Sequence, residues 1–184
     1  EEGITRSRRE DDDAPLLEIA SGHPSVRTEG DETHPSTEAL WDTLLSAGRD
    51  VAAVAVDDMH RLDKPTNTPN APPGKGWVQV FAREASAPAI CEALSRGHLY
   101  ASTGDEIQRI RVTEEVYSVW PSAAAATVEF FGGHGELLQT SRTSVDMPEA
   151  AYRLHGGEPY VRARVTGPEG KNAWTQAVRV KPLL

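Results

Sequence analysis

The sequence predicts an α/β unit followed by a small antiparallel β-sandwich. Over residues 15–110, apolar runs of strand length alternate with helical patterns in the order strand, helix, strand, strand, helix, strand, which is typical of a parallel sheet or barrel. Over residues 111–184, short β-rich runs follow one another without a helical pattern. Residues 1–14, which end in REDDDA, are predicted to be an acidic tail or an exposed loop.

The α/β unit is predicted to begin with a strand, a helix and a second strand. LLEIA at 16–20 has the apolar content of a short buried strand, and a long loop rich in Gly, Pro, Ser and Thr follows it. The helix is expected from Thr37, because Ser36 is a good N-cap and Gly48 suits the position just past the helix end. VAAVAV at 51–56 is apolar without alternation, which predicts a parallel strand covered on both faces.

A second helix between two further strands completes the predicted unit. WVQVFA at 77–82 and the short run at 99–101 are expected strands. The helix at 87–97 has Ser86 as its expected N-cap. Cys91 lies in the apolar pattern of this helix, so we expect it to be a buried small hydrophobe rather than a nucleophile.

In the C-terminal part, PYVRARV shows the clearest strand pattern. Val161, Ala163 and Val165 alternate with Arg162 and Arg164, which predicts a half-exposed strand. TGPEGK then provides a hairpin turn to the last strand.

Composition excludes several classes of protein. The net charge is −9, and residues 1–50 carry most of it, with 13 acidic and 5 basic side chains. Because no basic stripe is present to neutralise phosphates, we expect no nucleic-acid partner. No apolar run approaches the ~18 residues that a membrane span needs, and no secretory signal is visible, so the compartment stays open. A single cysteine allows neither an intramolecular disulfide nor a cysteine zinc cluster.

Polar side chains follow two of the predicted strands. Asp57, Asp58 and His60 come directly after 51–56, and His23 lies in the loop after 16–20. The carboxyl ends of parallel strands meet at one edge of a sheet, where ligands bind. Asp-x-His supplies a carboxylate and an imidazole, which are good ligands for manganese, zinc or iron. The alternatives are that the aspartates form a turn or cap a helix, and that His23 is an ordinary loop histidine.

Two other stretches are expected at the same edge of the sheet. Gly74 and Gly76 precede a strand, where the backbone can approach a ligand closely. Ser102, Thr103 and Gly104 follow the carboxyl end of another strand. A shared location for these stretches favours a binding site over a chance cluster.

Three stretches together resemble the polymerase and histidinol phosphatase (PHP) superfamily of metal-dependent hydrolases: WDTLLSAGRDVAAVAVDDMH, GKGWVQVFA and AICEALSRGHLYASTGDEIQRIRV. The ending YVRARVTGPEGKNAWTQAVRV is similar to the β domain that closes some PHP proteins. The resemblance implies the C-terminal part of a distorted (β/α)7 barrel over 15–110, with two or three divalent metal ions and phosphoester hydrolysis. In it Asp58 and His60 are metal ligands, Asp57 orients a ligand or a water, and His23 contacts substrate or transfers a proton.

The resemblance also implies that part of the site is missing. The family's opening His-x-His motif and its middle ligands are not found upstream of residue 16. We therefore expect a partner, either the missing N-terminal half of the barrel or another copy, and little or no catalysis by this chain alone. The expected substrate is a small molecule. The alternatives are an amide, carbamate or ester metallohydrolase, and a non-catalytic binding module.

Overall fold

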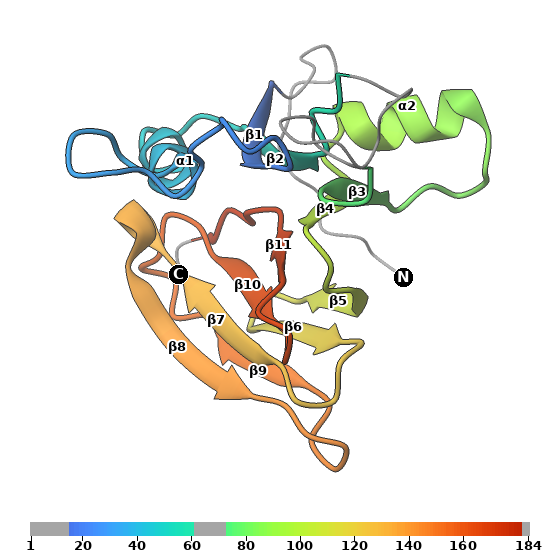
Figure 1. Ribbon diagram of the computed structural model, residues 1–184. Coiled ribbons are helices and arrows are strands. Elements are labelled where there is room, and N and C mark those ends of the chain that lie inside the picture. Colours follow the sequence, from blue (N-terminus) through green and yellow to red (C-terminus); the bar gives the residue numbers. More distant parts are fainter. Residues whose placement is uncertain (1–14, 61–72, 182–184) are drawn as a thin grey trace.

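The largest element of the structure is a six-stranded antiparallel sheet (Figure 1). The computed structural model describes residues 15–60 and 73–181. Neighbouring strands of this sheet follow the order β3-β4-β11-β10-β7-β8, and every neighbouring pair is antiparallel. The strands are β3 (Trp77–Val80), β4 (Leu99–Ser102), β7 (Thr127–Phe131), β8 (Leu137–Arg142), β10 (Arg162–Thr166) and β11 (Asn172–Thr175).

A three-stranded antiparallel sheet covers one face of the six-stranded sheet. It consists of β5 (Ile107–Val112), β6 (Val116–Pro121) and β9 (Ala150–Arg153), in the order β5-β6-β9. Alternate residues of both sheets fill the space between them, among them Tyr117, Val119, Val128, Phe130, Ala163 and Val165. The domain boundary predicted near residue 110 therefore lies within β5.

The opposite face of the six-stranded sheet is covered by α1 (Thr37–Ser46) and by the strands β1 (Leu16–Ser21) and β2 (Ala52–Val56). The strands β1 and β2 pair in parallel, which confirms the prediction for these two. Trp41 of α1 is fully buried in this second core, where its indole N–H donates to the carbonyl of Val51 at 2.9 Å. Helix α1 thus anchors the parallel pair to the larger sheet.

The predicted barrel portion is wrong. The described residues contain two α-helices, and beyond the two-stranded sheet of β1 and β2 their sheets are antiparallel. A parallel crossover needs a helix that packs back onto the face of the sheet. Helix α2 (Ala87–Ser95) buries only Ala93, and the chain returns from it so that β4 runs antiparallel to β3. The fold is mostly β, so a barrel of the (β/α) type is excluded for this part of the chain.

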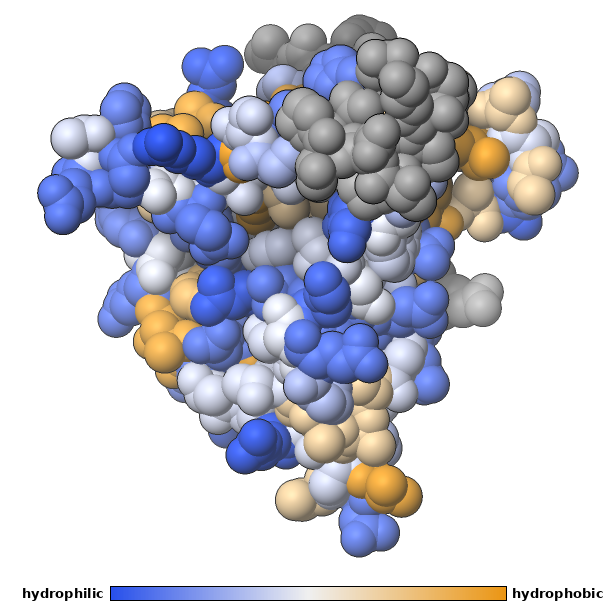
Figure 2. All heavy atoms as spheres, in the orientation of Figure 1, coloured by the Kyte–Doolittle hydropathy of each residue, from blue (hydrophilic) through white to orange (hydrophobic). Residues whose placement is uncertain are grey.

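Helix α2 lies at the margin of the molecule, where Cys91 is exposed. The expectation of a buried cysteine is therefore wrong, because the apolar face of α2 is only partly covered. Ile90 on this helix is 38% exposed, and Phe81, which directly follows β3, is 48% exposed. Figure 2 shows apolar atoms in separate places on this face of the molecule, beside α2 and at the opposite tip. No helix among the described residues is long and apolar enough to cross a bilayer.

The side chain of Gln176 joins the two layers at β2. Its amide accepts from the N–H of Ala53 at 2.8 Å and donates to the carbonyl of Ala53 at 2.8 Å. Replacement of Gln176 by Leu leaves both backbone groups buried without a partner, so we expect a loss of about 2–4 kcal/mol in unfolding free energy. Urea unfolding measures it, with the exposed Gln108→Leu as control. Equal losses in the two variants would contradict this role for Gln176.

Glu158 closes the turn between β9 and β10. It accepts from the Tyr152 hydroxyl at 2.6 Å and from the His155 backbone N–H at 3.1 Å. Burial raises the pKa of the Glu158 carboxyl, but these hydrogen bonds outweigh burial and bring the pKa down to about 2. A carboxyl with a lowered folded pKa stabilises the fold above its unfolded pKa, and this contribution disappears as pH falls toward 2.

We therefore expect Glu158→Gln to lose about 1–2 kcal/mol of unfolding free energy at neutral pH and progressively less between pH 4.5 and 2. Urea unfolding of both proteins across this range measures the difference. A difference that is the same at every pH would contradict the assignment.

Candidate functional site

His23, Asp58 and His60 come together at the carboxyl ends of β1 and β2. Because the two strands are parallel, the segments that leave them lie side by side, and the Gly22 N–H donates to the Val56 carbonyl at 2.8 Å. The rings of His23 and His60 meet edge to face, with centroids 5.1 Å apart. The Asp58 Oδ1 lies 3.4 Å from the His60 Nε2. The structure therefore brings together three of the four residues predicted from the sequence.

The cluster is open to solvent. The His60 side chain is 64% exposed and that of Asp58 is 31% exposed. The backbone of Asp58 has φ of 50°, in the left-handed region that few residues other than glycine adopt. Such strain persists where surrounding contacts hold it, and it is frequent at functional sites.

Asp57, the fourth predicted residue, holds the segment before β3. Its carboxylate accepts from the backbone N–H groups of Lys75 at 2.6 Å and of Gly74 and Gly76 at 2.9 Å each. Burial raises the pKa of the Asp57 carboxyl, but the three N–H groups outweigh it and leave the pKa below its ordinary value. The sequence predicted a close approach of Gly74 and Gly76 to a ligand. In the structure their backbone approaches the Asp57 carboxylate.

Two glycines allow this close packing. A Cβ on Gly76 would lie 2.5 Å from the carbonyl oxygen of Val56. A Cβ on Gly22 would lie 2.6 Å from the Cβ of Lys75 and 2.8 Å from the carbonyl oxygen of Asp57. The ends of β1 and β2 and the start of β3 are thus in direct contact beside the cluster. Gly22 and Lys75 were not singled out from the sequence, and no local pattern marks them.

His23 has a defined tautomer when it is neutral. Its Nδ1 accepts a hydrogen bond from the backbone N–H of Ser25 at 3.2 Å. An imidazole nitrogen that accepts carries no proton, so the proton lies on Nε2. The ring therefore presents an N–H donor at Nε2.

The donors fit two positions of a metal site. Tetrahedral ligands at about 2.0–2.2 Å from a zinc ion lie about 3.3–3.5 Å from one another. The separation of 3.4 Å between Asp58 Oδ1 and His60 Nε2 matches this value. No group of three His, Cys, Asp or Glu residues within 15–60 and 73–181 is arranged to hold a metal ion. Asp58 and His60 therefore fit as two ligands of an incomplete shell.

The stretch after β4 bonds elsewhere. The Ser102 hydroxyl donates to the carbonyl of Asp105, and the Thr103 N–H donates to the carbonyl of Asn172. Their hydrogen bonds thus connect β4 to its own turn and to β11. The sequence predicted these polar groups at the same edge as His23, but they make the contacts above and none with His23 is found among the described residues.

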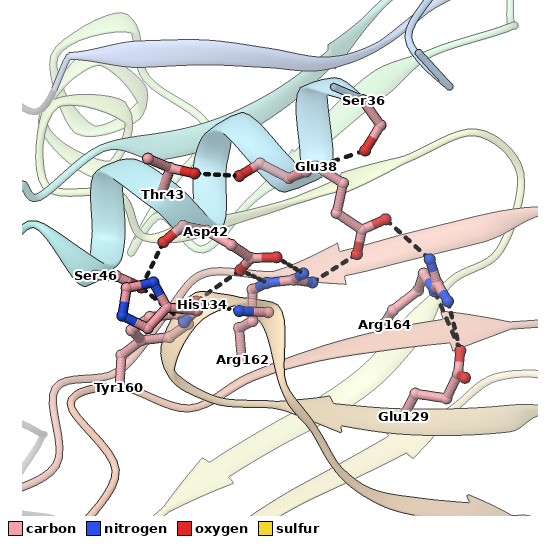
Figure 3. Close-up of polar contacts among 12 residues, drawn as sticks. Ser36, Glu38, Asp42, Thr43, Ser46, Glu129, His134, Tyr160, Arg162 and Arg164 are labelled. Atoms are coloured by element: carbon pink, nitrogen blue, oxygen red, sulfur yellow. Dashed lines mark hydrogen bonds and ion pairs between the residues drawn. The ribbon is translucent and has the colours of Figure 1, made fainter. Parts of the chain in front are cut away.

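A second polar cluster lies between α1 and β10 (Figure 3). Arg162 is 1% exposed and pairs with Asp42 at 2.6 Å and with Glu38 at 2.7 Å. Arg164 pairs with Glu38 at 2.9 Å and with Glu129 at 2.8 Å. The strand pattern correctly placed both arginines opposite Val161, Ala163 and Val165, but α1 covers that face, so the expected exposure is wrong for Arg162.

Four residues of this cluster line a surface pocket of about 250 Å³ together with Phe131 and His134: Glu38, Asp42, Arg162 and Arg164. Both guanidinium groups are already satisfied by carboxylates, and Arg162 also stacks over Phe131 at 4.5 Å. The cluster therefore holds α1 against the sheet. The candidate functional site is instead the group of His23, Asp57, Asp58 and His60.

Comparisons with known proteins add no family. No protein-family model matches the chain, and no curated protein or solved structure matches it either.

Proposed function

We propose that this chain contributes part of the active site of a metal-dependent hydrolase, with Asp58 and His60 as ligands of one divalent cation. The observation that carries the proposal is the meeting of Asp58, His60 and His23 at the carboxyl ends of two parallel strands, with the Asp58 and His60 donor atoms 3.4 Å apart. The strained backbone of Asp58 and the anchoring of Asp57 by three N–H groups support a site held in one geometry.

Phosphoesters are the proposed substrates, on the resemblance of VAAVAVDDMH and its neighbouring stretches to PHP hydrolases. Asp58 and His60 would hold a divalent cation, which would supply Lewis acidity toward a phosphoryl oxygen and a water. The proposal assigns the further metal ligands to a partner polypeptide or to another copy, because two ligands do not fill a coordination shell.

His23 is the proposed contact to the substrate, as a hydrogen-bond donor. Its Nδ1 accepts a hydrogen bond from Ser25, so its donor is the N–H at Nε2. Its ring lies edge to face against that of His60. A donor at this place can hydrogen-bond a phosphoryl oxygen and so stabilise the negative charge that develops on it, with the His23 proton staying on Nε2. Asp57 is a positioning residue, because its carboxylate contacts backbone groups and fixes the loop that flanks the ligands.

A substrate panel tests this function. With excess Mn²⁺ or Zn²⁺, the chain is expected to hydrolyse p-nitrophenyl phosphate slowly but above the metal-only rate, and EDTA is expected to remove the excess. A larger increase over the metal-only rate for p-nitrophenyl acetate or for an aryl carbamate than for p-nitrophenyl phosphate would favour the ester or carbamate hydrolase. The absence of any metal-dependent rate, with metal binding also absent, would favour a binding module.

A further inference from the structure

We propose that Lys75 recognises the negative charge of the substrate at this site, which makes the natural substrate a phosphoryl compound rather than a neutral ester. The inference rests on the proposed metal site at Asp58 and His60. Three observations carry it: the position of the Lys75 backbone, the place of its Cβ beside Gly22, and the charge of its surroundings.

The backbone of Lys75 is fixed beside the cluster. Its N–H donates to the Asp57 Oδ1 at 2.6 Å, and the flanking N–H groups of Gly74 and Gly76 bind the same carboxylate. Asp57 is adjacent in sequence to Asp58. The start of the Lys75 side chain is therefore held at the edge of the candidate site, although the residue itself is exposed.

The Cβ of Lys75 lies beside Gly22, which precedes His23. The absence of a Cβ on Gly22 makes room for the Lys75 Cβ, which lies 2.6 Å from where that atom would be. His23 is the next residue after Gly22. The four-carbon stem of a lysine carries a mobile ammonium group, which can approach an anion held beside His23 and His60.

The surroundings of Lys75 are negatively charged, so an anionic substrate needs a cationic side chain to compensate its charge. Asp57 and Asp58 are carboxylates, and the chain as a whole has a net charge of −9, so an approaching phosphate monoester meets repulsion. Within the described part of the chain, no carboxylate forms an ion pair with Lys75. Its ammonium group is thus available to compensate a phosphoryl charge, in contrast to Arg162 and Arg164, whose charges are already compensated.

The test separates this inference from the metal site. The ¹⁵N-labelled chain is first titrated with Zn²⁺, and the amide shifts of Asp58 and His60 report metal binding. The Zn²⁺-loaded chain is then titrated with methyl phosphate, and with trimethyl phosphate as the uncharged probe. We expect methyl phosphate to shift the amides of Gly22, His23 and Lys75, and trimethyl phosphate to leave them in place.

Lys75→Met keeps the stem and removes the charge. It is expected to weaken methyl phosphate binding about 10-fold, which corresponds to about 1.4 kcal/mol, and to leave the Zn²⁺ affinity unchanged. Lys75→Arg is expected to restore binding, and Lys171→Met, at an exposed lysine in the β10–β11 turn, serves as the control.

Equal binding of methyl phosphate by the wild type and Lys75→Met overturns the assignment, as does a wild type that does not bind it. Failure of Zn²⁺ to shift Asp58 and His60 contradicts the metal site instead, and is seen in the first titration, before any Lys75 variant is made.

Discussion

Arg162→Met is expected to lower the unfolding free energy by about 3–5 kcal/mol, because it leaves a buried carboxylate without its counter-charge. Asp42 is 4% exposed and accepts two hydrogen bonds from the Arg162 guanidinium, at 2.7 and 2.6 Å. Glu38 loses one of its two arginine partners. A loss of this size approaches the total stability of many domains of this length.

Urea unfolding measures this effect, and Arg111→Met, at an exposed position of β5, is the matched control. The control is expected to change the unfolding free energy by less than about 0.5 kcal/mol. A double variant, Arg162→Met with Asp42→Leu, removes both charges and is expected to recover at least half of the loss. If Arg162→Met is as stable as Arg111→Met, α1 is not held to the sheet by this cluster.

His60→Ala is expected to weaken Mn²⁺ or Zn²⁺ binding by at least about 10-fold, because it removes one of the two ligands that this chain supplies. The structure offers a matched control in His34, which forms a similar exposed pair with Asp31, the two donor atoms lying 3.1 Å apart. His34→Ala is expected to leave the affinity unchanged. Calorimetric titration with each metal ion measures both variants.

The comparison between the two histidine pairs distinguishes a metal site from an ordinary ion pair. An isolated ion pair of His and Asp on a surface contributes little to stability. His60 and Asp58 lie at the carboxyl ends of two parallel strands, with the ring of His23 5.1 Å from that of His60, whereas His34 bonds to the turn formed by Asp31 and Thr33. Equal loss of affinity in His60→Ala and His34→Ala would mean that Mn²⁺ binds acidic surface groups at large.

Local sequence signals predicted the local structure well. Ser36 accepts from the Ala39 N–H and Ser86 accepts from the Ala89 N–H, as expected of N-caps. Gly48 lies just past α1 with φ of 79°, as expected at that position. Hydrogen bonds to groups within a few residues determine these features, so the local sequence contains the necessary information.

The arrangement of the strands was not predictable in the same way. The apolar run of β2 correctly indicated a parallel strand, but β3 and β4 have similar apolar content and pair antiparallel. Their direction depends on where α2 packs, which is set by distant contacts. In β10, the alternation showed which residues share a face but not that α1 covers that face.

For the candidate site, the sequence indicated the ligands but not their supports. Parallel strands bring the groups at their carboxyl ends together, so His23 could be associated with Asp58 and His60 from strand order alone. The contact between Asp57 and the N–H groups of 74–76 joins residues that are 17 to 19 positions apart in the sequence, and no spacing rule predicts it. The position of Lys75 beside the site could not be predicted from the sequence for the same reason.

The most direct test of the metal site is a map of Mn²⁺ binding on the ¹⁵N-labelled chain. Mn²⁺ broadens the signals of nearby nuclei, so substoichiometric amounts identify the residues that surround it. The account predicts that the amide signals of His23, Asp58 and His60 lose intensity first, and that His60→Ala abolishes this preference. Broadening that begins instead around Asp31 and His34, or around His155 and Glu158, would contradict it.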